Sequence, residues 1–163
     1  MSPTLTFDIE TIPDVAGIRI LKNTDDKVSD AAVAGMAFKE RLEKTGSEFL
    51  PLHLHRVVAI SCVLRSNEGI RVWSLGGVDD TEAALVQRFF DGIEKFTPQI
   101  ISWNGGGFDL PVLHYRGLLS GVNAQRYWDM GEDDRDFKWN NYIGRYHARH
   151  LDLMDLLARF QPR

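Results

Sequence analysis

The chain has 163 residues, of which 44% are hydrophobic and 26% charged, a balance typical of one globular domain with a substantial core. Its formal net charge of −4 argues against a protein that holds nucleic acid by bulk electrostatic attraction, since such proteins are usually basic. No apolar run approaches the roughly 18 residues of a membrane span, so we expect no membrane partner.

The sequence contains a single cysteine, Cys62, which lies in the apolar run VVAISCVL. One cysteine cannot form a disulfide within the chain, and this usage is typical of a reducing compartment. We therefore expect a cytoplasmic location.

The first predicted element is a strand over residues 4–10, within the stretch TLTFDIETIPD. Hydrophobic and polar side chains alternate along it, and the strand is expected to end by Pro13, which cannot donate a ladder hydrogen bond. Asp8 and Glu10 share the polar face. Taken alone this pattern is weak, and a solvated strand end explains it. On a central strand, however, two carboxylates on one face are unfavourable unless a cation lies between them.

Residues 15–50 are predicted to form a helical insertion, whose clearest helix begins after Ser29 and ends at Gly46. Two strands, 55–66 and 70–76, follow and are joined by the turn Asn-Glu-Gly, which predicts a hairpin.

The next predicted helix covers residues 79–96, where an apolar residue recurs about every fourth position. Asp79 and Glu82 match a capping box at its start. A short strand over 98–104, three glycines and a helix over 108–121 come next, the last ended by Gly121.

The remaining sequence is predicted to contain an acidic, aromatic surface loop over 128–144 and a strand or helix over 149–160. Taken together, the order of elements predicts one α/β domain over 1–163, built as a mixed sheet with flanking helices.

The glycine-rich stretch SWNGGGFDLPVL places Asn104 at a strand end and Asp109 at a helix start. Asp109 has three interpretations. In the first, Asp109 is the N-cap of the helix. In the second, the glycines before it cradle a phosphate; this interpretation is disfavoured because neither glycine-loop fingerprint is present. Alternatively, Asp109 faces the end of the first strand and supplies a third carboxylate to an Mg²⁺ site.

Together, FDIET and NGGGFDLPVL resemble the first two motifs of the DEDD superfamily of 3′–5′ exonucleases. More narrowly, they resemble the proofreading domain of B-family DNA polymerases and its stand-alone bacterial relatives. YHARHLDLMDLL is also similar to those relatives, so the resemblance covers most of the chain except 15–50. It implies a ribonuclease H-like fold.

The resemblance implies that Asp8, Glu10 and Asp109 hold two Mg²⁺ or Mn²⁺ ions. Four positions would lie near the terminal nucleotide or shape the site: Thr11, Ile12, Asn104 and Phe108. Two ions about 4 Å apart activate a water and stabilise the leaving 3′ oxygen. The implied function is a metal-dependent 3′–5′ exonuclease acting on the 3′ end of single-stranded DNA (or RNA).

The family pattern also requires a fourth carboxylate, in a Tyr-x₃-Asp or His-x₄-Asp motif. After Asp109 only the second spacing occurs, in His147 with Asp152 and in His150 with Asp155. Asp152 and His147 are thus candidates for the fourth carboxylate and its base. The favoured interpretation is that this segment resembles the strand before the third motif, where the aspartate caps or packs. We therefore expect the third motif to be missing and the chain to be truncated at its C-terminus.

Several alternatives remain open. His53 and His55 alternate as a zinc pair would, although surface histidines at a strand entry are favoured. The loop aromatics either stack bases or pack beneath the loop: Trp128, Phe137, Trp139 and Tyr142. The competing functions are a non-catalytic nucleic-acid- or partner-binding module on a degraded nuclease fold and an exoribonuclease, which the histidine spacing favours. The oligomeric state is unknown.

Overall fold

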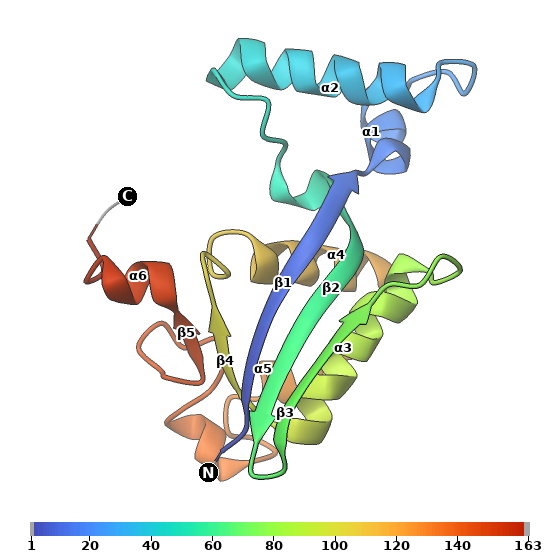
Figure 1. Ribbon diagram of the computed structural model, residues 1–163. Coiled ribbons are helices and arrows are strands. Elements are labelled where there is room, and N and C mark those ends of the chain that lie inside the picture. The colour runs from blue at the N-terminus through green and yellow to red at the C-terminus, as the bar shows by residue number, and fades with distance from the viewer. Residues whose placement is uncertain (1, 162–163) are drawn as a thin grey trace. The chain divides into compact units, whose positions relative to one another are not determined.

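The computed structural model describes residues 2–161, and the chain divides into two compact units, Met1–Glu10 with Val57–Arg163, and Thr11–Arg56. Within the described residues, no helix has the length and apolar character that crossing a bilayer requires. Figure 1 labels the α-helices and the strands. The elements in chain order are β1 (Thr4–Pro13), α1 (Val15–Lys22), α2 (Asp30–Thr45), η1 (Leu52–Leu54), β2 (His55–Ser66), β3 (Gly69–Leu75), α3 (Glu82–Phe96), β4 (Gln99–Ser102), α4 (Asp109–Ser120), α5 (Gln125–Trp128), η2 (Arg135–Lys138), β5 (His150–Asp152) and α6 (Leu153–Leu157).

The larger unit is built on a five-stranded sheet with the order β3-β2-β1-β4-β5. β2 and β3 form the predicted antiparallel hairpin, whereas β4 runs parallel to both β1 and β5. The chain therefore extends the sheet on one side of β1, then crosses over through α3 to build the other side. This mixed sheet with flanking helices confirms the predicted α/β fold class.

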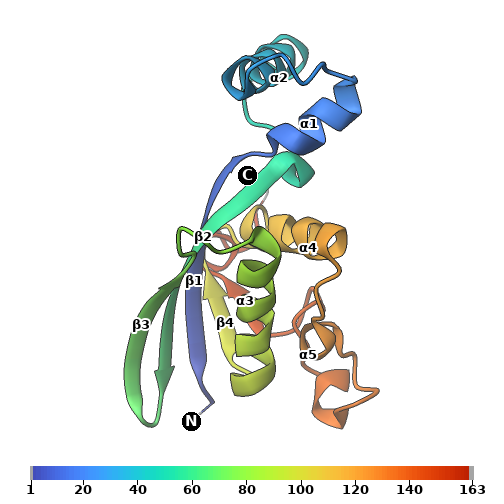
Figure 2. The same ribbon diagram turned by 90° about the vertical axis from the view of Figure 1, so that its right-hand side faces the viewer.

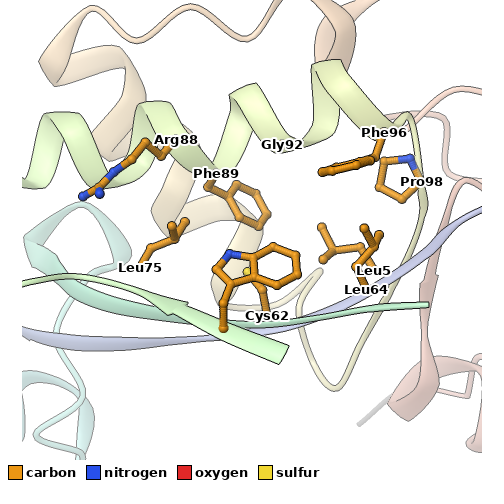
Figure 3. A pocket seen from close by; sticks show the side chains of 10 residues that line it. Leu5, Cys62, Leu64, Leu75, Arg88, Phe89, Gly92, Phe96 and Pro98 are labelled. Atoms are coloured by element: carbon orange, nitrogen blue, oxygen red, sulfur yellow. The ribbon is translucent and has the colours of Figure 1, made fainter. Parts of the chain in front are cut away.

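The core of this unit lies between the sheet and the helices α3 and α4, which stand on one side of it with α5 (Figure 2). The apolar face of β1 is buried as its alternation predicts, and the ring centroid of Phe7 lies 4.8 Å from that of Phe89 on α3. A cavity of about 20 Å³ remains between α3 and the strands (Figure 3). Cys62 lines it, and burial raises the pKa of this thiol to about 11. Cys62 is therefore an unreactive core residue.

Three predicted helix ends are confirmed. The Ser29 side chain accepts a hydrogen bond from the Ala32 amide at the start of α2, and Gly46 ends that helix at a positive φ of 76°. Gly121 ends α4 in the same left-handed conformation. All three ends follow from local chemistry: the serine side chain satisfies a backbone amide at the start of its helix, and each glycine adopts the left-handed conformation that ends a helix.

The capping box at the start of α3 is wrong. The N-cap is Thr81, whose hydroxyl accepts from the Ala84 amide, and Glu82 is the first helical residue. The Glu82 carboxylate is instead drawn into a buried ion pair: it accepts from Arg116 Nε at 2.8 Å and Nη2 at 2.5 Å, and from the Val57 amide at 2.7 Å. This cluster ties α3, α4 and β2 together.

The unit Thr11–Arg56 contains α1, α2 and η1, in the region predicted to be helical. Five buried side chains form its core: Ile18, Val33, Ala37, Leu50 and Leu54. Both ring nitrogens of His55 are engaged, Nδ1 with the Thr11 hydroxyl at 3.0 Å and Nε2 with the Leu50 carbonyl at 3.2 Å. The zinc-pair interpretation is therefore wrong, since His55 has no nitrogen left to bind a metal.

The acidic, aromatic segment predicted to be a surface loop contains η2 and the end of α5, and its aromatic side chains divide into two groups. Phe137 and Tyr142 are buried, and the Tyr142 ring stacks at 5.3 Å on that of Tyr127, a buried residue of α5 just before the segment. The Tyr142 hydroxyl donates to the Pro98 carbonyl at 2.6 Å. Packing is therefore confirmed for Phe137 and Tyr142 and stacking of bases on them is wrong, whereas Trp139 is exposed.

Candidate active site

The polar centre of the site lies where β1 and β4 separate. The two strands pair only from Thr4 to Thr6, opposite Gln99 to Ile101, and β4 ends at Ser102. Beyond this point, Asp109 occupies the place beside β1: its Oδ1 accepts a hydrogen bond from the Ile9 amide at 3.2 Å. Asp109 is only 4% exposed. The expectation that it faces the first strand is met.

The N-cap interpretation of Asp109 is wrong. Asp109 is the first residue of α4, and the N-cap position belongs to Phe108, which makes no side-chain capping bond. The carboxylate turns to β1 instead, because the Ile9 amide has lost its partner strand and needs an acceptor.

The separation of β1 and β4 is also where sheet topology predicts a ligand. In an open α/β sheet, ligands bind outside the carboxyl ends of the strands, at the point where the chain switches from one side to the other. In this sheet β1 leads to β2 on one side, and β4 is reached by a crossover on the other. Asp109 is therefore placed at the topological switch point.

Close approach of other atoms disfavours a side chain at two of the glycines between β4 and α4, Gly105 and Gly107. A Cβ on Gly105 would lie 2.3 Å from the Ser102 hydroxyl, and one on Gly107 would lie 2.5 Å from Asn104 Oδ1. Asn104 itself has a positive φ of 59°. The amides of Gly107 and Phe108 donate to the Asn104 carbonyl at 2.9 and 3.0 Å, so they are engaged within the turn. The glycines serve to bring the chain back to β1, and the phosphate-cradle interpretation is not supported.

Asp152, the last residue of β5, holds this turn in place. Its Oδ1 accepts from the Asn104 amide at 2.9 Å and its Oδ2 from the Gly106 amide at 3.0 Å. Oδ1 also accepts from the Met154 amide at 3.1 Å, which caps α6. The interpretation that this aspartate caps or packs is confirmed, and it links β5 to the turn that carries Asp109.

His150, two residues earlier on β5, was missed as part of this support. Its Nε2 lies 2.7 Å from the hydroxyl of the buried Ser102. Burial lowers the pKa of His150, while the charges of Asp152 and Asp155 raise it. The signal was present in HLD, because alternate residues of a strand share a face. His147, by contrast, accepts the Asn141 amide on Nδ1 at 3.0 Å.

The electrostatics of the site centre on Asp109. The pKa of its carboxyl is raised to about 6, mainly by burial and also by the negative charges of Asp8 and Asp152. Hydrogen bonds from the backbone amides of Ile9 and of Asp109 itself act in the opposite direction. Asp8 and Glu10 are exposed on the polar face of β1. A divalent cation would relieve this repulsion, since it favours the ionised carboxylate.

The donor set fits a hard cation that is only partly enclosed by protein. Across residues 2–161, no three side chains of His, Cys, Asp or Glu converge as a ready-made metal cluster. Mg²⁺ is commonly held by one or two carboxylates with water and substrate phosphate completing its shell. Asp109 with Asp8 meets that requirement, with Glu10 one pleat further along the same face of β1.

The four other predicted site residues are divided between the units. Asn104 and Phe108 are half-buried in the glycine turn, next to Asp109. Thr11 and Ile12 belong to the unit Thr11–Arg56, where the Thr11 hydroxyl contacts His55 and Ile12 is exposed.

Several solved structures resemble this chain. The family B DNA polymerase from the archaeon Pyrobaculum calidifontis is 22% identical over 98% of this chain and 16% of its own, with a TM-score of 0.51. A metal-free complex of E. coli ExoI with single-stranded DNA is 11% identical over 96% of this chain and 29% of its own, with a TM-score of 0.44. E. coli exonuclease I in complex with a dA16 oligonucleotide is 12% identical over 98% of this chain and 30% of its own, with a TM-score of 0.42. The chain thus spans less than a third of each of these proteins. The likeness to the polymerase supports the ribonuclease H-like fold.

No curated protein matches the sequence significantly. A family described as "Predicted 3'-5' exonuclease related to the exonuclease domain of PolB" matches residues 47–163. This region includes the glycine turn, Asp109 and Asp152, whereas β1 with Asp8 and Glu10 precedes it. The chain belongs to this family of 3′–5′ exonucleases related to the exonuclease domain of PolB.

Proposed function

We propose that the chain is a metal-dependent 3′–5′ exonuclease that hydrolyses the terminal phosphodiester of single-stranded DNA. One observation carries the proposal: the buried Asp109 carboxylate lies against β1 at Ile9, close enough to Asp8 for the two charges to interact. A buried carboxylate beside another one is costly, and a divalent cation bound between them would offset that cost.

In this proposal Asp8, Glu10 and Asp109 hold two Mg²⁺ or Mn²⁺ ions. When bound, such ions supply an activated water and stabilise the leaving 3′ oxygen. The Ile9 amide orients the Asp109 carboxylate, and Asp152 fixes the turn on which Asp109 is carried. Asn104 and Phe108 flank Asp109 and would shape the space for the terminal nucleotide, with Thr11 and Ile12 following Glu10 along β1.

DNA is the proposed substrate because the family is related to the exonuclease domain of a DNA polymerase. The histidines that would favour an exoribonuclease are engaged within the fold. Nδ1 of His147 bonds the Asn141 amide, and Nε2 of His150 bonds the Ser102 hydroxyl. Neither histidine is therefore preferred as a general base over a metal-activated water.

The single, free and buried Cys62 supports a further part of the proposal, a cytoplasmic location. A buried thiol with a raised pKa needs no oxidising environment and gains nothing from one. Fractionation of the producing cells would test this: recovery with cytoplasmic markers is expected, and recovery with the membrane fraction would contradict it.

The nuclease proposal is tested with a 5′-labelled single-stranded DNA oligomer and an RNA oligomer of the same sequence. In Mn²⁺ the protein should shorten the DNA one nucleotide at a time, and a chelator should stop the reaction. Asp109→Asn and Asp8→Asn should lower the rate by at least about a hundredfold, about 2.7 kcal/mol of transition-state stabilisation.

Asp79→Asn is the matched control, since Asp79 is an exposed carboxylate of the same unit without a capping bond to α3. It should retain the wild-type rate. A ladder that survives Asp109→Asn would show contaminating nuclease, and no ladder on either oligomer would refute the proposal in favour of a binding module.

A further inference from the structure

A cleft of about 840 Å³ adjoins the glycine turn on the β5 side of the site. Residues 142–148 form one wall and α6, continued to Phe160, forms another. The cleft reaches Gly106 and Asp152, the same pair whose hydrogen bond holds the turn that carries Asp109. It is therefore continuous with the support of the active site.

The first wall presents a cation and an aromatic ring. The guanidinium carbon of Arg145 lies 5.9 Å from the ring centroid of Tyr146, and the Tyr146 side chain is 91% exposed. Arg145 makes no ion pair with any residue from 2 to 161. Packing does not explain why a tyrosine is exposed beside this arginine, so the pair has no evident role in the stability of the fold.

The α6 part of the lining supplies apolar surface. Phe160 is 73% exposed, and Leu156 on α6 is partly exposed beside it. The cleft thus has aromatic side chains on two walls and mixes apolar with polar lining. This composition is unlike the uniformly apolar groove that docks a helix.

Among the charged and titratable residues that line the cleft, Arg145 carries the permanent positive charge. Asp152 is engaged by three backbone amides, whereas His147 and His150 each bond a partner through one ring nitrogen. Asp155 adds a negative charge on the α6 side. A phosphate is therefore expected at Arg145, with its uncharged base on the neighbouring ring of Tyr146.

We propose that this cleft binds one nucleotide of a single-stranded polynucleotide, with its base stacked on Tyr146 and its phosphate paired with Arg145. Sites for single strands combine cationic groups that follow the backbone with aromatic rings on which bases stack. The inference rests on the proposed function, since it places part of the substrate strand next to the active site. In a protein with a net charge of −4, a local cation of this kind is needed to retain a polyanion.

The test is equilibrium binding measured by fluorescence anisotropy in chelator, where no hydrolysis proceeds. The probes are a labelled oligothymidylate and an oligouridylate of equal length, which distinguish DNA from RNA. The variants are Tyr146→Ala, Tyr146→Phe and Arg145→Ala. Thermal unfolding curves verify that each variant is folded, as expected for side chains this exposed.

A second cation–aromatic pair provides the matched control. Lys138 Nζ lies 5.3 Å from the ring centroid of Trp139, which is 77% exposed, and neither residue lines the cleft. Lys138→Ala and Trp139→Ala therefore remove the same chemistry elsewhere on the unit. Their affinities should stay within twofold of wild type.

Tyr146→Ala should weaken binding about tenfold, the loss of one stacked base, whereas Tyr146→Phe should bind as wild type does. Arg145→Ala should lower the slope of log affinity against log salt by about 0.7, the value for one phosphate of a single strand. Equal losses in the control pair, unchanged affinity in the cleft variants, or no binding by the wild type would overturn the inference.

The outcome also separates the two proposals. Weakened binding in the cleft variants without any metal-dependent shortening of the strand would refute the nuclease and keep the cleft. Shortening that depends on Asp109, together with wild-type affinity in the cleft variants, would keep the nuclease and refute the cleft.

Discussion

Asp109 combines burial with charge. It is held between the end of β4 and the middle of β1, where its hydrogen bond to Ile9 satisfies one backbone amide. The backbone hydrogen bonds to this carboxyl do not offset the loss of water and the nearby charges of Asp8 and Asp152, and its pKa rises accordingly. A residue that costs stability in the free protein is expected where function needs it.

Asp109→Asn should therefore stabilise the protein in the absence of metal. The pKa of the Asp109 carboxyl is 3.8 in the unfolded chain and about 6 in the folded protein. Between these values the folded state binds the extra proton, so stability falls as the pH rises and the full cost is present above about 6. A rise of about 2 pKa units corresponds to about 3 kcal/mol at most.

Urea denaturation in chelator checks this prediction. At pH 8 Asp109→Asn should be more stable than wild type by about 2–3 kcal/mol, and the difference should nearly vanish at pH 4. Asparagine keeps the acceptor for the Ile9 amide but has no charge to lose. The exposed Asp79→Asn should change stability by less than about 0.5 kcal/mol. A destabilised Asp109→Asn at pH 8 would contradict the argument.

At the scale of elements, β5 acts on the candidate active site through the turn between β4 and α4. Asp152→Ala would leave the amides of Asn104 and Gly106 without their acceptor and remove the cap of α6. The expected cost is about 2–4 kcal/mol, because these bonds are made to a charged group. Hydrogen exchange at Asn104 and Gly106 should accelerate more than exchange within β4.

Asp129 offers a matched control for this experiment. Its carboxylate also accepts backbone amides, those of residues 131 to 134, in a turn outside the glycine segment. Asp129→Ala should accelerate exchange in its own turn and leave Asn104 and Gly106 unchanged. If Asp152→Ala left those two amides as protected as before, β5 would not support the turn.

The ion pair between α3 and α4 is the second link at this scale. Arg116→Ala would leave the Glu82 carboxylate buried with only the Val57 amide bonded, and should cost about 3–5 kcal/mol. Replacing both residues, as Glu82→Gln with Arg116→Met, should cost less, because no charge remains buried. Arg71→Ala, which breaks an exposed pair with Glu68, should cost less than about 1 kcal/mol. A single variant as stable as the double variant in urea would contradict this view.

At the scale of the whole molecule, local patterns were enough to predict most elements. The alternation around Phe7 identified β1 and its buried face, and the turn Asn-Glu-Gly identified the hairpin. Ser29, Gly46 and Gly121 marked helix ends because capping depends on neighbours in sequence. These features need no knowledge of distant contacts.

The errors arose where a distant partner takes a polar side chain. Glu82 resembles a capping residue until Arg116 is placed beside it, and Asp109 resembles an N-cap until Ile9, 100 residues earlier, competes for its carboxylate. Asp152 likewise acts on a turn 46 to 48 residues away. The local sequence therefore identified which residues are candidates for the site, and tertiary contacts decide which groups each of them bonds.

The two compact units lead to a last prediction, about how the molecule opens. Ile18 is fully buried in the core of Thr11–Arg56, a hydrophobic cluster made only of residues from that unit. Ile18→Ala should cost about 2–5 kcal/mol, and a unit with its own core can open without the sheet. Native-state hydrogen exchange should accelerate in α1 and α2 and stay slow in β4. Ile100→Ala, equally buried on β4, should accelerate exchange in the sheet. Equal acceleration of both units by Ile18→Ala would mean that they unfold as one, because their separate cores would then not set separate stabilities.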